Sequence, residues 1–544
     1  MDYLSDPRFD YCRSAINAIN TEQHTSLISL FDLTCAEHTD RAAYNCLGQD
    51  VRFSEIEAKS RAFAAWLQTL GLEAGDRVAV QLPNLIQYPI VAWGVIRAGM
   101  TLVNTNPLYT QHELKHQLND SGARVIVMLS DFLAAAEATL ADTPVEQVVV
   151  TNVFDMMEAQ PAPPHSLGND IQLSTLPDAL IAGESLNLTP VEANLDSLAI
   201  LQYTGGTTGV AKGAMLTHGN VLASTLQAQQ HMEEAGDEDD ESILIAPLPI
   251  YHIFGFSLYV VSNFAIGGRS VLIPDPRDSS ALLQTMQAFP FTGFAGVNTM
   301  FVALMADPLF DSVDWSHLKA SIAGGAALVP EVAREWQRRT GSPILEGYGL
   351  SETAASLTCN TRSAARLGTV GTAMGSQQIK LADSEGKPVA AGEEGELCVR
   401  GAQVMVGYWN RPDETDKAID AEGYFRTGDI AVQTEDGYYR IVDRIKDMIL
   451  VSGFNVYPNE IEAVVFEHPD IVECAVVARK DEKSGEAVAL YAVSSNPDLT
   501  SEDLRKFCRQ KLTNYKVPKF VYFEKELPKS NVGKVLRREL RDRV

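Results

Sequence analysis

Between about residue 50 and residue 360, short apolar runs alternate with helix-like stretches. Two of the runs are RVAVQL (77–82) and SLAILQYT (197–204), and one helix-like stretch is SEIEAKSRAFAAWLQTL (54–70). This alternation predicts doubly wound α/β layers, in which helices cover parallel strands and ligands bind at the carboxyl ends of the strands. A chain of 544 residues is also too long for one hydrophobic core, so roughly three or four folding units are expected.

The pattern changes twice toward the C-terminus. From about 376 to 444 the predicted strands are separated by Gly and Asp turns with no helix between them, which indicates a small β unit. After Arg444 the predicted order is strand, helix, strand, strand, helix, and a proline opens the helical stretch PNEIEAVVFEHP (458–469). The last unit therefore has an α+β pattern.

Charge is distributed unevenly along the chain. The formal net charge of −27 argues against a general nucleic-acid binder. Residues 501–544, in contrast, contain 13 Lys and Arg against 6 Asp and Glu. Such a basic segment is either a solvated face or the place where a polyanionic substrate is met.

The cysteines and the N-terminus bear on the cellular compartment. The seven cysteines have no CxxC spacing, which is typical of a reducing cytoplasm and gives no sign of a zinc cluster. The first residues, MDYLSDPRFDY, contain neither the basic nor the apolar segment of a signal peptide. No uncharged apolar run is long enough for a membrane helix. We therefore expect a cytoplasmic protein.

The stretch YTGGTTGVAKG (203–213) directly follows a predicted strand. Its glycines permit tight turns that bring N–H groups close to an anion, its threonines add hydroxyl donors, and its lysine adds a mobile positive charge. The P-loop of nucleotide hydrolases has Gly before the Lys and Ser or Thr after it, whereas Ala211 and Gly213 stand there in this chain. The stretch therefore indicates a phosphate-holding loop of another kind, with an ordinary glycine-rich turn as the alternative.

A second short pattern, HELKH (112–116), matches the H-E-x-x-H motif of zinc proteases. Its context, QHELKHQLNDSG, is typical of a surface amphipathic helix with Leu114 and Leu118 turned inward. No third ligand follows at the metzincin spacing. A metalloprotease is therefore not expected.

Seven segments occur in a fixed order over about 340 residues. They are YTGGTTGVAKG (203–213), PLPIYHIFGF (247–256), AGGAALV (323–329), LEGYGLSET (345–353), GYFRTGD (423–429), DRIKDMILVSGFNVYPNEIE (443–462) and LPKSNVGKVLRREL (527–540). Together they resemble the motifs of the adenylate-forming superfamily, which contains acyl-CoA synthetases, luciferases and peptide-synthetase adenylation domains. Within it, the form GGTTGVAKG and the run VSGFNVYPNEIE are most similar to bacterial long-chain-fatty-acid–CoA ligases.

The resemblance implies an α/β fold with a large N-terminal domain and a small, mobile α+β C-terminal domain. The large domain would consist of two doubly wound α/β subdomains and a small β-barrel. The expected bounds are 1–443 for the N-terminal domain, with subdomains at about 1–195 and 196–375 and the barrel at 376–443, and 444–544 for the C-terminal domain.

The resemblance also implies a two-step reaction. A carboxylate attacks the α-phosphate of ATP, which releases pyrophosphate and leaves an acyl-adenylate, and the thiol of coenzyme A then displaces AMP. Because a carboxylate is a poor nucleophile that meets a polyanion, the enzyme has to neutralise charge at the phosphates. ATP and coenzyme A would be co-substrates, Mg²⁺ the cofactor, and a medium- or long-chain fatty acid the acyl substrate.

The family motifs assign a nucleotide site to the matching residues of this chain. Relatives usually have Ser at position 205, so Gly205 is the weaker ligand in a loop that would wrap the β- and γ-phosphates. The alternative for Glu352 is an exposed loop acid, and for Asp429 a turn residue. The expected roles are adenine stacking for Tyr348, ribose binding for Asp429 and Arg444, and Mg²⁺ binding for Glu352 and Thr207. The expected ATP and AMP ligands are Thr204, Gly205, Gly206, Thr207, Thr208, Gly209, Lys212, Gly324, Gly325, Tyr348, Gly349, Ser351, Asp429 and Arg444.

Catalysis and domain motion are assigned in the same way. Lys534 in SNVGKVLRREL would contact the carboxylate and the α-phosphate as charge develops. The C-terminal domain would then move away, with Lys446 as the hinge, so that coenzyme A can enter. Gly453 would afterwards face the thiol in a narrow coenzyme A channel. The residues expected to be catalytic are Lys534, Glu352 and His252.

The acyl pocket is expected beside PLPIYHIFGF (247–256). His252 and Gly325 would line it, and Phe256 stands at the place of a tunnel gate in long-chain enzymes; a core aromatic side chain is the alternative for Phe256. Amino-acid-activating relatives carry an Asp in this region, and its absence here disfavours an amino-acid substrate.

Two kinds of alternative function remain open. An aryl- or short-chain-acid ligase, or an enzyme that loads a carrier protein, would use the same chemistry. A non-catalytic acyl-binding protein would share the fold, although the presence of Lys534, Glu352 and Lys212 argues against it. The expected partners are a fatty acid, ATP and coenzyme A but no nucleic acid; peripheral docking on the inner membrane and homodimer formation are left open.

Overall fold

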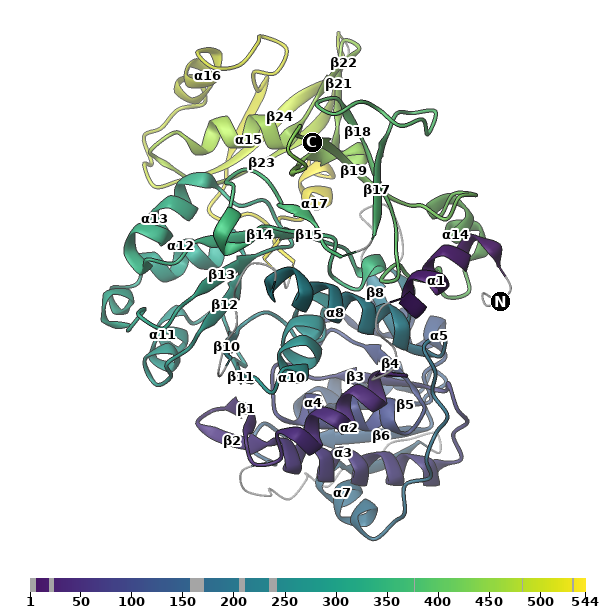
Figure 1. The fold of residues 1–544 in the computed structure, drawn as a ribbon. Helices are drawn as coiled ribbons and strands as arrows, with labels where there is room; N and C mark the ends of the chain where they lie inside the picture. The colour runs from purple at the N-terminus through teal and green to yellow at the C-terminus, as the bar shows by residue number, and fades with distance from the viewer. Residues whose placement is uncertain are drawn as a thin grey trace.

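The computed structural model describes residues 6–18, 24–156, 171–204, 211–233, 242–375, 377–481, 483–530 and 533–544. Within these residues the strands form four sheets, and the expected α/β class is confirmed. Figure 1 shows the C-terminal sheet at one end of the molecule, the seven-stranded sheet at the other and the nine-stranded sheet between them.

The seven-stranded sheet has the order β7-β6-β5-β3-β4-β8-β9, and its neighbours are parallel except for β8 and β9. Apolar runs such as β6 are buried along their whole length because helices cover the sheet. The strands are β3 (Arg77–Gln81), β4 (Thr101–Asn104), β5 (Val125–Leu129), β6 (Gln147–Thr151), β7 (Gln172–Thr175), β8 (Leu198–Thr204) and β9 (Lys212–Thr217). The helices along this part of the chain are α1 (Asp10–Ala18), α2 (Leu27–Glu37), α3 (Phe53–Leu67), α4 (Gln87–Arg97), α5 (Gln111–Ser121), α6 (Ser130–Leu140) and α7 (Leu176–Glu184).

The nine-stranded sheet has the order β16-β15-β14-β13-β12-β10-β11-β1-β2. Its central strands are parallel, and β2, β15 and β16 add antiparallel edges. The strands are β1 (Ala42–Cys46), β2 (Gln49–Arg52), β10 (Ile243–Ala246), β11 (Arg269–Leu272), β12 (Gly293–Gly296), β13 (Ala320–Ala323), β14 (Ile344–Tyr348), β15 (Thr358–Cys359) and β16 (Thr372–Ala373). Its helices are α8 (His218–Glu233), α9 (Ile253–Gly255), a π-helix (Phe256–Ser262), α10 (Asn263–Ala265), α11 (Ser279–Gln287), α12 (Asn298–Ala306) and α13 (Pro330–Thr340).

Sheet membership does not divide the chain at residue 195. Strands β8 and β9 follow this position yet belong to the seven-stranded sheet, and β1 and β2 precede it yet extend the nine-stranded sheet. The reason is that β1 pairs in parallel with β11, with Tyr44 opposite Ser270. One continuous apolar core joins both sheets, so the two subdomains share their packing.

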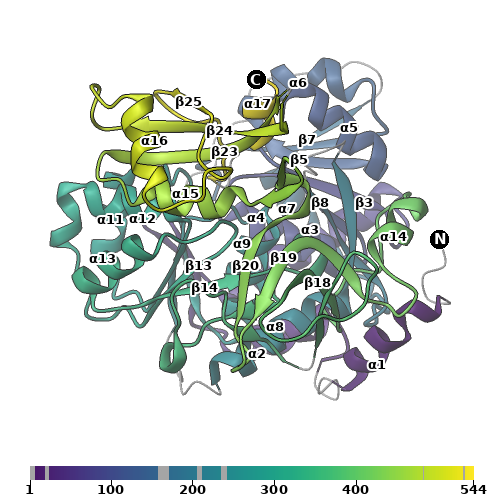
Figure 2. The same cartoon turned by 90° about the horizontal axis from the view of Figure 1, so that it is seen from above.

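The segment expected to form a β-barrel is an antiparallel sheet with the order β17-β18-β19-β20. Its edge strands do not pair with each other in the described residues, so no closed barrel forms there. Figures 1 and 2 show this sheet next to the C-terminal domain. The elements are β17 (Gln378–Ala382), β18 (Glu394–Arg400), α14 (Pro412–Ala418), β19 (Phe425–Gln433) and β20 (Tyr439–Arg444).

The C-terminal part has the α+β pattern expected from the sequence. Its sheet has the order β22-β21-β24-β23, with β25 parallel to β24. Alternate residues of β23 enter separate apolar clusters, Val476 on one face and Val477 on the other, because successive strand side chains point to opposite faces. The elements are β21 (Ile449–Val451), β22 (Phe454–Val456), α15 (Pro458–Phe466), β23 (Ile471–Asp481), β24 (Gly485–Ser494), α16 (Ser501–Arg509), β25 (Phe520–Phe523) and α17 (Arg537–Arg541).

The HELKH segment forms part of helix α5, as the amphipathic pattern predicts. Glu113 takes part in a capping box with Thr110, and Leu114 and Leu118 are buried. His116 Nε2 lies 2.9 Å from the carbonyl oxygen of Ala211. In the described parts of the chain no group of three or more His, Cys, Asp or Glu side chains is placed to hold a metal ion. A search of the same residues found no helix both long enough and apolar enough to span a bilayer.

Candidate active site

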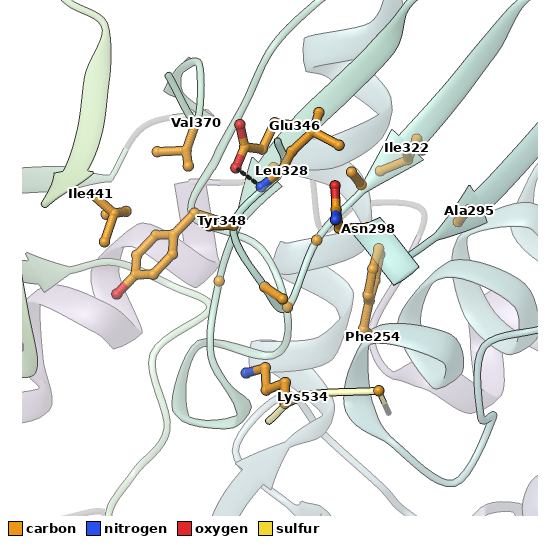
Figure 3. A pocket seen from close by; sticks show the side chains of 18 of the residues that line it. Phe254, Ala295, Asn298, Ile322, Leu328, Glu346, Tyr348, Val370, Ile441 and Lys534 are labelled. Atoms are coloured by element: carbon orange, nitrogen blue, oxygen red, sulfur yellow. Dashed lines mark hydrogen bonds between the residues drawn. The ribbon is translucent and has the colours of Figure 1, made fainter. Parts of the chain in front are cut away.

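A cavity of about 2780 Å³ lies beside the carboxyl ends of β13 and β14 and continues under the C-terminal domain. Residues from the nine-stranded sheet, the four-stranded sheet and the loop before α17 line it. The site is therefore complete only when the C-terminal domain packs against the sheets that precede it in the chain. Figure 3 shows Tyr348 and Ile441 on one side of this pocket, Phe254 and Ala295 on the other, and Lys534 beside them.

The phosphate loop is described only at its two ends. Gly205, Gly206, Thr207, Thr208 and Gly209 lie outside the described residues. Thr204 and Ala211 line the cavity, and Thr204 pairs with Lys212 across β8 and β9. The ends are fixed from outside, because Tyr203 donates to Asp120 Oδ2 at 2.7 Å and Trp409 N–H donates to the carbonyl of Gly213 at 2.8 Å.

Lys212 is held at the rim of this loop. Its ammonium lies 2.8 Å from Glu414 Oε2 and 4.6 Å from the centre of the Tyr408 ring. Glu414 also lies 2.8 Å from Lys417 Nζ. The hydrogen bonds from Lys212 and Lys417 lower the pKa of Glu414 to about 2.

The turn after β14 carries Glu352 in a tightly defined backbone. A Cβ at Gly349 would lie 1.7 Å from the carbonyl oxygen of Ala355, so only glycine fits there. Ala354 and Ala355 have φ of +48° and +83°, left-handed values that cost of order 1–3 kcal/mol each in non-glycine residues. Glu352 lies in the 3₁₀ turn Ser351–Thr353, is buried, and accepts a hydrogen bond from Tyr408 at 2.7 Å.

Tyr348, Asp429 and Arg444 meet although they lie on three strands. Tyr348 donates from its hydroxyl to Asp429 Oδ2 at 2.5 Å, and Arg444 Nε lies 3.2 Å from Asp429 Oδ1. The register of β19 and β20 places Asp429 directly opposite Arg444. Burial, reinforced by the charge of Asp429, raises the pKa of Tyr348, so its hydroxyl stays protonated.

Lys534 enters the cavity from the C-terminal domain. Its Cε lies 3.7 Å from the position that a Cβ on Gly325 would take, and Gly325 has a φ of +79°. A short turn presents it, in which Ser530 N–H donates to the carbonyl of Lys534 at 2.7 Å. Burial, together with the nearby charge of Arg444, lowers the pKa of Lys534 to about 8.

His252 lies close to this lysine and caps helix α9. Its Nδ1 accepts a hydrogen bond from Phe254 N–H at 3.3 Å, so the proton of a neutral ring resides on Nε2. Burial, and secondly the charge of Lys534, lowers the pKa of His252 to about 4. The ring is therefore neutral at physiological pH and can donate a hydrogen bond from Nε2.

Comparisons with known proteins agree with this geometry. The family model of the AMP-binding enzymes matches residues 31–409, and that of the AMP-binding enzyme C-terminal domain matches residues 460–534.

The chain belongs to the AMP-binding enzyme family.

Among similar proteins, a long-chain-fatty-acid–CoA ligase of Escherichia coli O157:H7 is 46% identical over 96% of this chain and 95% of its own. One of Bacillus subtilis is 35% identical, with 95% and 94% covered. The crystal structure of ATP-bound MatB from Rhodopseudomonas palustris has a TM-score of 0.84 and 28% identity, and the match covers 94% of this chain and 98% of that one.

Glu346 is one of several cavity residues of this AMP-binding enzyme that were not predicted from the sequence. Glu346 lies two residues before Tyr348, within the quoted motif LEGYGLSET, and accepts a hydrogen bond from Leu328 N–H at 3.1 Å (Figure 3). Burial raises its pKa to about 7. The only signal in the sequence was an acid on an otherwise apolar strand. Val370 and Ile441 line the same part of the cavity.

Phe256, expected either as a tunnel gate or as a core aromatic side chain, lies in the core in this structure. Its ring is fully buried in the main core and is not among the described residues that line the cavity. Phe254 lines the cavity instead, and a Cβ at Gly324 would lie 2.9 Å from its ring. Residues two apart on a helix lie about 200° apart around its axis, so Phe254 and Phe256 face different sides.

The expected hinge segment borders the cavity, since Arg444 and Asp447 line it. Lys446 lies in the 3₁₀ turn Ile445–Asp447, and desolvation of its ammonium, reinforced by the nearby charge of Arg444, lowers its pKa. Asp447 beside it is buried and lies 2.7 Å from Arg541 of α17. Gly453, with a φ of +85°, forms the turn between β21 and β22 and is not among the described residues that line the cavity.

Proposed function

We propose that the protein is an ATP-dependent long-chain-fatty-acid–CoA ligase that forms an acyl-adenylate and releases pyrophosphate and AMP. The observation that carries the proposal is the placement of Lys534 in the cavity that Glu352 and Asp429 also line. The charges of both acids act on the lysine and raise its pKa against the effect of burial. Membership of the AMP-binding enzymes and the near-complete match to long-chain ligases support this assignment.

The nucleotide would occupy the slot around Tyr348. Its ring and the apolar side chains of Val370 and Ile441 suit a flat base, and the pair Asp429 and Arg444 suits the ribose hydroxyls. Glu346 supplies an acceptor in the same slot, and an acceptor favours the amino group of adenine over the carbonyl of guanine. Glu346→Leu is therefore expected to lower the preference for ATP over GTP in pyrophosphate release. An unchanged preference would show that Glu346 does not select the base.

The family resemblance implies Mg²⁺ as the metal, and the residues that line the cavity suit it. Magnesium is usually held by one or two carboxylates together with substrate phosphates, and it does not need a cage of protein ligands. Glu352 offers such a carboxylate at the cavity wall, and one of its oxygens accepts from Tyr408. Bound there with ATP, the ion would offset phosphate charge. Thr207, the second expected ligand, stays a prediction from the motif.

Lys534 and His252 would handle the charge that develops in the first step. Lys534, charged below a pKa of about 8, would attract both the carboxylate and the α-phosphate. His252 is neutral and would donate from Nε2 to a substrate oxygen without acting as a base. Gly324 and Gly325 suit this meeting, since a side chain at Gly324 would collide with Phe254 and Gly325 has a left-handed φ of +79°.

The acyl chain would lie along one face of the nine-stranded sheet. Two pairs in register, Gly293 with Ala320 and Ala295 with Ile322, line the cavity there with apolar residues, and all of them except Ile322 are small. Leu258 of the π-helix lines it too. Because the lining here is apolar, we expect this face to take the chain of a fatty acid, with the aryl or short-chain acids of the alternative ligases as the competing substrates.

The C-terminal domain would move between the two steps. Lys446 would act as the hinge, and rotation would bring the turn at Gly453 toward the site for coenzyme A. Lys446→Pro is expected to preserve adenylation and slow thioester formation, because proline fixes φ and removes an N–H. If both half-reactions of this variant run at wild-type rates, Lys446 is not the hinge.

The decisive experiment measures pyrophosphate release and coenzyme A-dependent AMP release with acids from acetate to oleate and with aryl acids. Highest kcat/KM for long chains supports the proposal, whereas a maximum with aryl or short acids would replace it with the alternative ligase. Pyrophosphate release without any thioester would indicate loading of another acceptor. We expect this activity in the cytoplasm, and co-sedimentation with inner-membrane vesicles would test peripheral docking.

A further inference from the structure

Tyr408 lies between two side chains that the proposed reaction uses. Its hydroxyl donates to Glu352 Oε1 at 2.7 Å, and the ammonium of Lys212 lies 4.6 Å from the centre of its ring. Glu352 lines the cavity, whereas Tyr408 is buried and is not among the described residues that line it. One side chain behind the cavity wall therefore contacts both the carboxylate proposed for the metal and the lysine that follows the phosphate loop.

The backbone on both sides of Tyr408 is bonded to the same two elements. Met405 N–H donates to the carbonyl of Glu352 at 2.8 Å, and Trp409 N–H donates at 2.8 Å to a carbonyl of β9. Between them, Tyr408 forms an antiparallel bridge with Ala214 of β9. The segment is thus fixed to the strand that carries Lys212 and to the turn that carries Glu352.

Glu414 is a further side chain that contacts the ammonium of Lys212. Its carboxylate lies 2.8 Å from Lys212 Nζ, and helix α14 carries it. The same carboxylate lies 2.8 Å from Lys417 Nζ, so it is shared between two cations. The ammonium of Lys212 is therefore confined between a carboxylate and the face of the Tyr408 ring.

We propose that Tyr408 is a positioning residue that fixes Glu352 and Lys212 relative to each other for binding of Mg²⁺ and ATP. The inference rests on the metal role proposed above for Glu352. A hydroxyl that occupies Oε1 leaves the second oxygen for a cation and restricts rotation of the carboxylate. The ring meanwhile sets the place of Lys212 through a separate contact, so the hydroxyl and the ring have separable effects.

The test compares Tyr408→Phe, which removes only the hydroxyl, with Tyr438→Phe as a matched control. The hydroxyl of Tyr438 donates to the carbonyl of Ala364, outside the group described here. Two quantities are measured: the Mg²⁺ concentration for half-maximal pyrophosphate release, and the affinity of Mn²⁺ for the enzyme with a non-hydrolysable ATP analogue, by electron paramagnetic resonance. Loss of an outer partner of a metal ligand weakens metal binding about 10- to 100-fold, so Tyr408→Phe is expected to shift both by about tenfold or more. The control is expected to match the wild type.

Further variants separate the possible failures. If Glu352→Gln leaves Mn²⁺ affinity unchanged, the metal role of Glu352 is wrong and the inference about Tyr408 is overturned with it. If Glu352→Gln weakens Mn²⁺ binding and Tyr408→Phe does not, only the role of Tyr408 is overturned. Tyr408→Leu also removes the ring, and Glu414→Gln removes the other partner of Lys212. Both variants are expected to have a higher KM for ATP than Tyr408→Phe. If their KM values equal that of Tyr408→Phe, the proposal that the Tyr408 ring positions Lys212 is overturned.

Discussion

On the N-terminal side of the cavity, polar side chains are bonded to partners from distant segments. Glu352 accepts from Tyr408, and Asp429 accepts from Tyr348. On the C-terminal side, Lys534 arrives on a short turn, and no side-chain hydrogen bond holds its ammonium among the described residues. The first side is fixed before substrate arrives, whereas the ammonium of Lys534 can withdraw without breaking a side-chain hydrogen bond of its own.

The cost of burial reinforces this difference. A charged lysine in the closed cavity is disfavoured, which is why the pKa of Lys534 falls to about 8. Bound anions would compensate this cost, so the closed position is stabilised by the substrates themselves. Four changes, from the largest expected effect to the smallest, test the contrast between a fixed wall and a removable lysine.

Phe256→Ala tests the fixed side and should have the largest effect. Phe256 is fully buried, and truncation of such a ring removes about 3–5 kcal/mol from the free energy of unfolding. Urea unfolding measures this loss, and the chain-length profile should not change. The matched variant is Phe254→Ala, whose half-buried ring lines the cavity; it should lose less stability and change the profile. The reverse outcome would restore Phe256 as the gate.

Lys534→Ala tests the removable side. Loss of one preorganised electrostatic group costs roughly 10²- to 10³-fold in rate, so pyrophosphate exchange should fall by that factor. Thioester formation from supplied acyl-adenylate should persist, because the lysine would have left the site by then. Similar losses in both half-reactions would show that the two sides act together throughout the cycle.

The pH profile of adenylation should follow the charge of Lys534. Above its pKa of about 8 the free enzyme loses the charge, so kcat/KM for pyrophosphate release should fall about tenfold per pH unit. Folding lowers this pKa from 10.5, so the folded state binds fewer protons between pH 8 and 10.5. The group therefore destabilises the fold below pH 8, and this penalty disappears as pH rises through the window. A flat profile to pH 10 would contradict the assignment.

Tyr457→Phe should have the smallest effect. The hydroxyl of Tyr457 in the C-terminal domain donates to Glu394 Oε2 of β18 at 2.8 Å, and such a bond contributes about 0.5–1.5 kcal/mol. Its loss should weaken the closed position, so adenylation slows a few-fold while thioester formation does not. Stopped-flow measurement of each half-reaction checks this, and slower thioester formation alone would be inconsistent with a removable lysine.

Local features of the molecule followed from the sequence. The alternation of apolar runs predicted the α/β class, and the spacing of Leu114 and Leu118 predicted the helix that contains HELKH. The ordered motifs led to residues that do meet, since Tyr348 and Asp429 are in contact and Lys534 reaches Gly325. These features were predictable because each depends on spacing within a short segment or on a motif carried by one segment.

The tertiary structure decided which side chains face the cavity. Phe254 and Phe256 are two apolar rings two residues apart in one helical segment, so they face different sides, and only the packing of that segment decides that the first lines the cavity and the second enters the core. No motif assigned a role to Glu346 or to Tyr408. Tyr408 meets Glu352 across 56 positions of sequence because its segment pairs with β9. Local spacing fixes the conformation of a segment, but the neighbour of a side chain depends on strand pairing between distant segments, and the folded sheets alone determine that pairing.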